Sequence, residues 1–345
     1  MGTTLHEILS RVGRRRLAAA AALTLTLAVL VATPQLLGSH VVNAFGALDE
    51  ADPLWLWLAG LGFLLAVLGA AGSWFSAIRL CGGRLSLGDA CARYGAGSLV
   101  NTFVPLRAGD AVRIGLFSRV LPKSRERIWT SGGAFAALGL ARLVVLAGFV
   151  VAGTLAGALP LWSPLAVLGL VAAGVALTLR AKSNGAGGHL SHLLDAFRAL
   201  RQEPLAALRL VGWIALSTAG RLTAATAVGA AMEIHRPLVA ALVIVPALDV
   251  AGTLPLLPAN VGVTSGAVAV AFQAHGISFA HGLAAGIAFH AVETTVGILF
   301  GLVSVVWLAP YPSPHIRRIA LVAVAASGCL ALAGTFSATV LLPLV

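Results

Sequence analysis

The sequence predicts an all-α integral membrane protein with about seven transmembrane helices and two re-entrant hairpins broken by proline and glycine. Of its 345 residues, 59% are hydrophobic and only 10% are charged, with a mean hydropathy of +0.96. A soluble domain carries about 25% charged residues. Long apolar runs recur at intervals, as helical spans require, whereas a barrel would alternate apolar and polar residues.

The net charge of +11 indicates contact with anionic lipid rather than with nucleic acid. Basic residues gather in the cytoplasmic loops of membrane proteins and touch anionic headgroups there. Three cysteines, Cys81, Cys91 and Cys329, have no metal-ligand spacing. We therefore expect no metal, no redox role and no cofactor.

The first elements set the orientation of the chain. A basic N-terminus, residues 1–16, precedes an apolar run at 17–38 that is longer than the 7–15-residue core of a signal peptide. We expect a retained span entered from the cytoplasm, and one polytopic membrane domain over 17–345. The second span, 54–78, follows an acidic outer loop and ends at Arg79 on the inner side.

The next segment predicts the first hairpin. If residues 87–104 crossed the membrane, six basic residues between Arg107 and Arg127 would lie outside, against the positive-inside rule. The return leg, 110–120, is also too short to cross. A turn near Pro105–Gly109 that leads back to the cytoplasm removes both objections, and protein or a wet cavity must surround such a turn.

The remaining elements follow from the same reasoning. A cytoplasmic loop, 181–204, contains an amphipathic surface helix at 189–202. Further spans are expected at 128–157, 165–180, 205–231, 282–308 and 319–343.

A second hairpin is expected to enter from outside through 238–256 and to return through 263–276. It carries Pro258 and Gly262 at the four-residue spacing of Pro105 and Gly109. Broken segments in corresponding positions of two halves mark midplane binding sites in transporters. The halves 54–157 and 205–308 are therefore hypothesised to form an inverted repeat. The alternative is a chance match, because proline and glycine are common in membrane helices.

Charged groups at membrane depth are rare and are usually paired or functional. We take these charged residues, together with one glycine from each turn and the proline of the second turn, as candidate substrate-binding residues. The candidates are Arg107, Gly109, Asp110, Arg113, Arg142, Arg221, Asp249, Pro258, Gly262, His290 and Glu293.

Around the first turn, the pattern suits a phosphate headgroup. The guanidinium forks of Arg107 and Arg113 match phosphate geometry. Gly109 lets the backbone approach a ligand, and a helix beginning there offers N–H groups to an anion. The alternative is structural: Asp110 and Arg113 lie three residues apart and could form a salt bridge that only holds the hairpin.

Arg142 lies too deep in its span to reach the interface, so we expect it to bind a ligand or to pair with Asp110 or Glu293. Asp249 is expected to bind a cation or to pair with Arg221.

His290 and Glu293 share a helix face at a spacing that occurs in metal sites, but no further ligand lies nearby in sequence. The chain has no nucleotide-binding loop, nucleophile elbow or zinc motif.

The stretch NTFVPLRAGDAVRIGLFSRVLP resembles the flippase-like membrane region of lysylphosphatidylglycerol synthases, and the resemblance extends over about 55–308. That family has a proline, three residues, a glycine, an acidic residue and then an arginine three further on. Pro105, Gly109, Asp110 and Arg113 match this pattern, and Arg142 falls at the family's embedded arginine.

This chain also departs from the family pattern. Ala141 and Val145 stand where the embedded arginine often has acidic neighbours. In the second motif Pro258 and Gly262 fit loosely, while Ser265 replaces the usual glutamate and His290 corresponds to an arginine.

The resemblance implies a plasma-membrane protein that moves anionic or aminoacylated phospholipids, or polyprenyl-linked lipids, between leaflets without ATP. The soluble aminoacyl-transfer domain is missing from this sequence, so synthase activity is not expected and the protein is not expected to be an enzyme. One alternative is a non-catalytic partner of an envelope glycosyltransferase or lipid-modifying enzyme. Another is an intramembrane lipid-modifying enzyme with His290, Glu293 and Asp110 as its acid–base groups.

Overall fold

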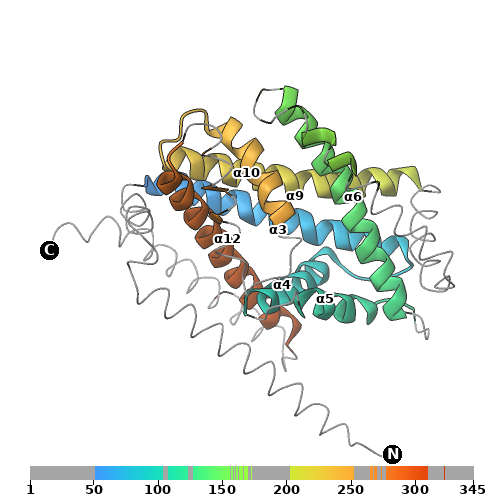
Figure 1. Cartoon of the computed structure of the whole chain (residues 1–345). Helices are drawn as coiled ribbons and strands as arrows, with labels where there is room; N and C mark the ends of the chain where they lie inside the picture. The colour runs from blue at the N-terminus through green and yellow to red at the C-terminus, as the bar shows by residue number, and fades with distance from the viewer. Residues whose placement is uncertain are drawn as a thin grey trace, which may run out of the picture.

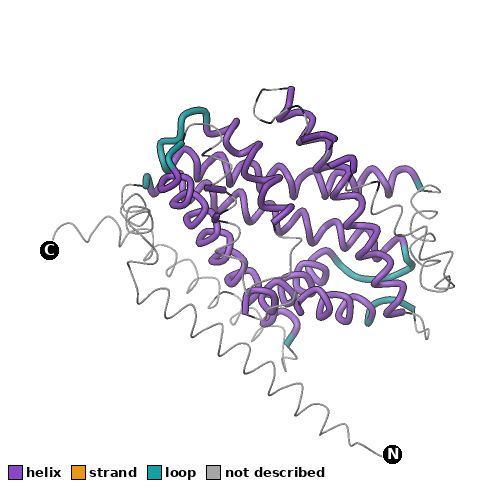
Figure 2. The backbone as a smooth tube through the Cα atoms, in the orientation of Figure 1, coloured by secondary structure: helices purple, strands orange, loops and turns teal. Residues whose placement is uncertain are grey.

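A computed structural model describes residues 51–103, 108–122, 127–155, 203–251 and 277–309, with short pieces at 157–172 and 265–273 and residue 322. All regular structure in these ranges is helical (Figures 1 and 2). The main helices are α3 (Pro53–Leu80), α4 (Leu87–Phe103), α5 (Ala108–Ser118), α6 (Arg127–Leu155), α9 (Pro204–Ala231), α10 (Pro237–Ala251) and α12 (Phe279–Leu308).

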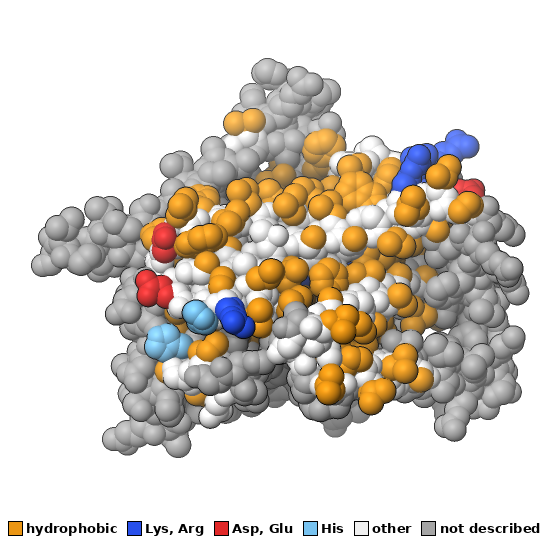
Figure 3. Space-filling view, turned by 90° about the horizontal axis from the view of Figure 1, so that it is seen from above, with side chains coloured by type: hydrophobic (Ala, Val, Ile, Leu, Met, Phe, Trp, Pro, Cys, Tyr) orange, Lys and Arg blue, Asp and Glu red, His pale blue; other side chains and the backbone are white. Residues whose placement is uncertain are grey.

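Among the described residues, four helices are long and apolar enough to cross a membrane: α3, α6, α9 and α12. They confirm the spans predicted at 54–78, 128–157, 205–231 and 282–308. One face of the molecule has apolar side chains over its middle, with charged side chains mainly toward its two ends (Figure 3). A band of this kind suits a lipid-facing surface.

The predicted elements other than these four spans are described only in part or lie outside the described residues. At the position of the first predicted hairpin lie two short helices that pack on each other, α4 with 17 residues and α5 with 11, and we call this pair the α4–α5 hairpin. The predicted spans at 17–38 and 319–343 and the surface helix at 189–202 lie outside the described residues, apart from residue 322. The predicted span at 165–180 and the return leg at 263–276 are described only in short pieces.

α3 and α9 form the most extensive helix–helix contact among the described helices and lie side by side in opposite directions (Figure 1). The Asp52 amide, just before α3, donates to the carbonyl of Ala231 at the end of α9, at 3.2 Å. At the crossing, a Cβ on Gly69 or Gly220 would collide with the backbone of the other helix. Glycine at these positions therefore permits the contact, as small residues do between membrane helices.

Equivalent positions meet at this crossing. Gly69 lies as far from the proline that begins α3 as Gly220 lies from the proline that begins α9. Ala66 and Ser217 are equivalent in the same way, and the Ser217 hydroxyl donates to the Ala66 carbonyl at 2.8 Å. Antiparallel helices that meet at equivalent positions are related by an approximate two-fold axis perpendicular to both.

Other helices also make contacts between the two halves of the chain, 54–157 and 205–308. α4 of the first half packs on α12 of the second, and α10 of the second half contacts α6 of the first. The α4–α12 contact is close, because a Cβ on Gly95 would collide with Ser304 and one on Gly301 with Leu99.

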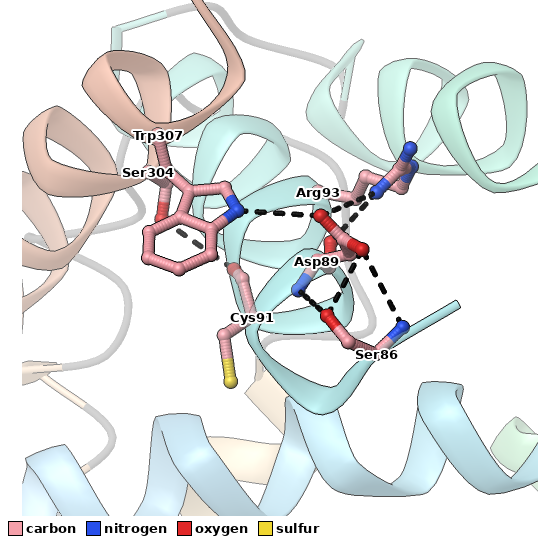
Figure 4. A network of polar contacts seen from close by, with 6 residues as sticks. All are labelled: Ser86, Asp89, Cys91, Arg93, Ser304 and Trp307. Carbon is pink, nitrogen blue, oxygen red and sulfur yellow. Dashed lines mark hydrogen bonds and ion pairs between the residues drawn. The ribbon is translucent and has the colours of Figure 1, made fainter. Parts of the chain in front are cut away.

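A polar network fastens the start of α4 to the end of α12 (Figure 4). Ser86 and Asp89 cap α4 reciprocally: the Asp89 amide donates to Ser86 Oγ at 3.1 Å, and Ser86 Oγ donates to Asp89 Oδ2 at 2.9 Å. Trp307 Nε1 donates to Asp89 Oδ1 at 3.3 Å, and Arg93 Nη1 lies 3.8 Å from the same oxygen. One carboxylate thus links two halves of the chain.

Candidate functional site

A cavity of about 630 Å³ lies between α3, α4, α5, α6, α9 and α12. This volume is within the range of small-molecule sites, roughly 300–1,000 Å³. Aromatic and aliphatic side chains of α3 and α6 form much of its wall. Its polar lining consists of Tyr94, Asn101, Asp110, Arg113, Arg142, Ser217, Thr218, Arg221 and Glu293.

Five charged residues singled out from the sequence therefore meet around one space: Asp110, Arg113, Arg142, Arg221 and Glu293. They come from α5, α6, α9 and α12, and thus from both halves of the chain. The sequence predicted that each lies at membrane depth, and the fold brings them together.

The Arg113 guanidinium is engaged within the α4–α5 hairpin. Nη1 donates to Asp110 Oδ1 at 2.6 Å, Nη2 to Ser98 Oγ at 2.6 Å, and Nε to the Tyr94 carbonyl at 3.3 Å. The guanidinium carbon also lies 4.1 Å from the centroid of the Tyr94 ring. Because a guanidinium has five N–H donors, at most two remain for a ligand. This geometry matches the structural alternative, a salt bridge that holds the hairpin.

Asn101 completes the hairpin and was not singled out from the sequence. Its Oδ1 accepts from the Gly109 amide at 2.7 Å, and its Nδ2 donates to Asp110 Oδ1 at 3.2 Å. A Cβ on Gly109 would collide with the Gly97 carbonyl and with Asn101. In this arrangement the missing side chain of Gly109 allows α4 and α5 to pack closely. The Gly109 amide is already bonded to Asn101 and is not available to a ligand.

Tyr94 lies near both cavity-lining arginines of the first half, Arg113 and Arg142. Its ring lies under Arg113, and the charge of Arg142 acts on its hydroxyl. Arg142 itself has an exposed side chain that lines the cavity. A sequence signal for this site does exist, because Tyr94, Ser98 and Asn101 follow the i, i+4, i+7 spacing that marks one helix face.

Arg221 and Glu293 line the side of the cavity formed by the second half, and His290 lies beside Glu293. The Glu293 side chain is 40% exposed and lines this space, and its Oε2 lies 3.7 Å from His290 Nδ1. The charge of Arg221 acts on the Glu293 carboxylate. His290 is 14% exposed, and its Nε2 is buried with no hydrogen-bond partner in the structure as described.

Ser265, which departs from the family pattern, packs against α12 at Gly286. It is 2% exposed, and its hydroxyl likewise has no hydrogen-bond partner among the described residues. The family's glutamate position is thus buried against α12, the helix that carries His290.

The remaining candidates are not placed. Arg107, Pro258 and Gly262 lie outside the described residues. Asp249 belongs to α10, but its side chain is not described. Within the described ranges, no three His, Cys, Asp or Glu side chains are grouped so that they could hold a metal ion.

Several apolar helices long enough to span a membrane, around a cavity lined by charged residues, define a polytopic membrane protein. The model of the lysylphosphatidylglycerol synthase transmembrane region matches residues 16–301 of the chain. The chain belongs to this family, which confirms the predicted resemblance and links the protein to lipid modification. Comparison with curated proteins and with solved structures found no significant match.

Proposed function

We propose that the protein moves a phosphate-bearing lipid between the two leaflets of the plasma membrane, as a transporter rather than an enzyme and without ATP. The observation that carries this proposal is the cavity, in which arginines from both halves face one space. The headgroup would enter this space while the acyl chains remain in the surrounding lipid.

Arg142 and Arg221 are the residues we expect to hold the phosphate. Arg142 extends into the cavity with an exposed side chain, whereas Arg113 is held by Asp110 and Ser98. Arginine forks bind phosphate through two parallel, charge-assisted hydrogen bonds. Charged side chains inside a membrane are costly, and they commonly mark the path of a substrate.

The crossing of α3 and α9 supports a transporter. If both helices span the membrane, the approximate two-fold axis through Ala66 and Ser217 lies in the membrane plane, as in an inverted repeat. Both residues also line the cavity. Transporters built from inverted repeats bind their substrate near the midplane, where the repeats meet.

The orientation belongs to the same proposal. The N-terminus would be cytoplasmic, and α4 and α5 would form a re-entrant hairpin that enters from the cytoplasmic side. The support is the group of basic residues that precedes and follows α5, which the positive-inside rule assigns to that side.

The test is leaflet-to-leaflet movement of a fluorescent phospholipid in reconstituted vesicles. We expect the double variant Arg142→Ala, Arg221→Ala to reduce transport at least about tenfold. The phosphate would lose the charge-assisted hydrogen bonds from both guanidinium groups. The control is Arg209→Ala, which removes an exposed arginine from the same helix as Arg221 but outside the cavity. Transport at the wild-type rate in a folded double variant would exclude this site.

One observation favours a second candidate, an intramembrane enzyme that modifies a lipid. His290 and Glu293 lie 3.7 Å apart, which suits an acid–base pair. This candidate predicts a lipid of changed mass after incubation with the protein, detected by mass spectrometry, and loss of that product in His290→Ala.

A further inference from the structure

One titratable group that lines the cavity, Glu293, has no part in the proposed phosphate binding, and a second, His290, lies beside it. His290 and Glu293 lie on one face of α12, with His290 Nδ1 3.7 Å from Glu293 Oε2. The second ring nitrogen of His290, Nε2, is buried and has no hydrogen-bond partner in the described part of the chain. When Nδ1 carries the hydrogen directed at Glu293, Nε2 has a lone pair that can accept another proton.

Arg221 connects this pair to the proposed anion site. It lines the same cavity as Glu293, and its charge acts on the Glu293 carboxylate. A phosphate bound to Arg221 would compete with Glu293 for that charge and would add a negative charge beside the pair. A nearby negative charge favours the protonated forms of both histidine and carboxylate.

The elements around α12 supply few other groups that could take this role. In the described residues, α9 presents Arg221 and α6 presents Arg142, while the cavity-lining residues of α3 are uncharged. The acid of α5, Asp110, is held by Arg113. α4 presents Tyr94 to the cavity and, at its far end, Asp89, which is bonded to Trp307.

We propose that the His290–Glu293 pair is a proton-binding site, and that it takes up one proton when a phosphate headgroup binds, so that the lipid anion and the proton cross together. The inference rests on the proposed lipid transport. Because coupling between two ligands is reciprocal, a proton on the pair also strengthens binding of the anion. The proton comes from water on the side where the headgroup enters and leaves with it on the other side.

The coupling has an electrostatic advantage. A phosphodiester carries one negative charge, and moving one elementary charge through the membrane potential involves about 2.3 kcal/mol per 100 mV. An anion and a proton together carry no net charge, so the membrane potential does not oppose their movement. The pH difference across the membrane then sets the direction of net lipid movement.

The experiment uses the full chain in phosphatidylcholine vesicles that contain a trace of tail-labelled phosphatidylglycerol, whose only charge is its phosphodiester. A difference of one pH unit is imposed across the vesicle membrane, and the label in each leaflet is measured at steady state by quenching from outside. For one proton per lipid, we expect the ratio between the leaflets to approach about tenfold, with more lipid on the alkaline side, and to invert when the gradient is reversed.

Two variants test the site itself. His290→Asn and Glu293→Gln should bring the steady-state ratio close to one, whatever the rate at which it is reached, because neither replacement side chain titrates in this range. Arg209→Ala, outside the cavity, should keep the wild-type ratio. Accumulation at the wild-type ratio in both variants would overturn the assignment of the proton site.

The outcomes separate the two proposals. If the wild-type protein moves no labelled lipid, the proposed function fails and proton coupling fails with it. If the protein equilibrates the lipid but a pH difference leaves the ratio at one, coupling is overturned while lipid transport stands.

Discussion

The two arginines that Tyr94 touches illustrate how neighbouring side chains decide what a charge does. Arg113 is 11% exposed and has three N–H groups bonded inside its own hairpin. Arg142 lies close enough to Tyr94 for its charge to act on the hydroxyl, and its exposed side chain lines the cavity. The first arginine is therefore suited to holding α4 and α5 together, and the second to meeting a ligand.

Replacing Arg113 should reduce stability before it affects binding. Arg113→Ala leaves the Asp110 carboxylate without its cation, and because the pair is only partly buried the cost should lie below the roughly 3–5 kcal/mol of a fully buried pair. Thermal unfolding in detergent should show a marked loss. Arg113→Lys should not restore stability, because an ammonium cannot bond Asp110, Ser98 and Tyr94 from one planar fork. Full stability in Arg113→Ala would contradict the structural role.

Substitutions of Tyr94 should separate its two roles. Tyr94→Phe keeps the ring beneath Arg113 and removes only the hydroxyl, on which the charge of Arg142 acts, so we expect weaker lipid binding with little change in thermal stability. Tyr94→Leu also removes the cation–π contact, which is worth about 1–2 kcal/mol. Binding titrations and unfolding curves of both variants check this, and an equal effect of the two on stability would contradict it.

The sequence indicated some of these contacts and not others. The spacing of Asp110 and Arg113 predicted a possible pair, because residues three apart share a helix face. Ser98 and Asn101 were not recognised, since uncharged polar residues at helical spacing are frequent and many bond their own helix. Their role depends on α5 lying against α4, which local spacing does not reveal.

At the scale of the elements, the carboxylate of Asp89 joins the start of α4 to the end of α12. Asp89 bonds Ser86 and Trp307 and lies near Arg93 (Figure 4). Partial burial raises the pKa of the Asp89 carboxyl, but the hydrogen bonds from Ser86 and Trp307 and the charge of Arg93 outweigh it, so the pKa lies below its ordinary value. The ionised form is the one that the folded junction favours.

This direction predicts an effect of pH on stability. Since the folded pKa of Asp89 is lower than the unfolded pKa, about 3.9, its contribution is present above the unfolded pKa and is lost as pH falls through the folded pKa. The unfolding midpoint of the wild type should approach that of Asp89→Asn in acid and exceed it at neutral pH. A constant difference between pH 7 and pH 3 would contradict this assignment.

The sequence predicted the positions of the helices, but it did not predict which helices pack against one another. The spans at α3, α6, α9 and α12 were predicted with ends within a few residues, because an apolar run long enough for the bilayer marks a helix by itself. The pairing of α3 with α9 was not predicted. All helices in a membrane are apolar on the outside, so hydrophobicity does not say which two will touch.

At the scale of the whole molecule, the two halves meet most closely where α3 crosses α9, and a methyl group can test that contact. Gly220→Ala places a Cβ against the Ala66 amide and the Gly62 carbonyl, which are backbone atoms that cannot rotate away. Overpacking of this kind costs about 1–3 kcal/mol. The unfolding temperature in detergent should therefore fall.

The matched control lies on the same helix. Among the described residues, nothing lies within 4 Å of a Cβ built on Gly212. Gly212→Ala should leave stability unchanged or raise it by up to about 1 kcal/mol, as alanine does in a helix. Equal stability of the two alanine variants would mean that the crossing is looser than described here.

The crossing at Ala66 and Ser217 also bears on the direction of the proposed transport. Two helices related by a two-fold axis in the membrane plane present nearly the same backbone to the two sides of the membrane. Their backbone alone therefore cannot give a transporter a preferred direction. Whatever vectorial preference the protein has must come from side chains that differ between the halves, such as Arg142 on α6 and Glu293 on α12, or from the gradients on the two sides of the membrane. The same molecule, inserted in the opposite orientation, should then still carry its cargo down whatever gradient it meets.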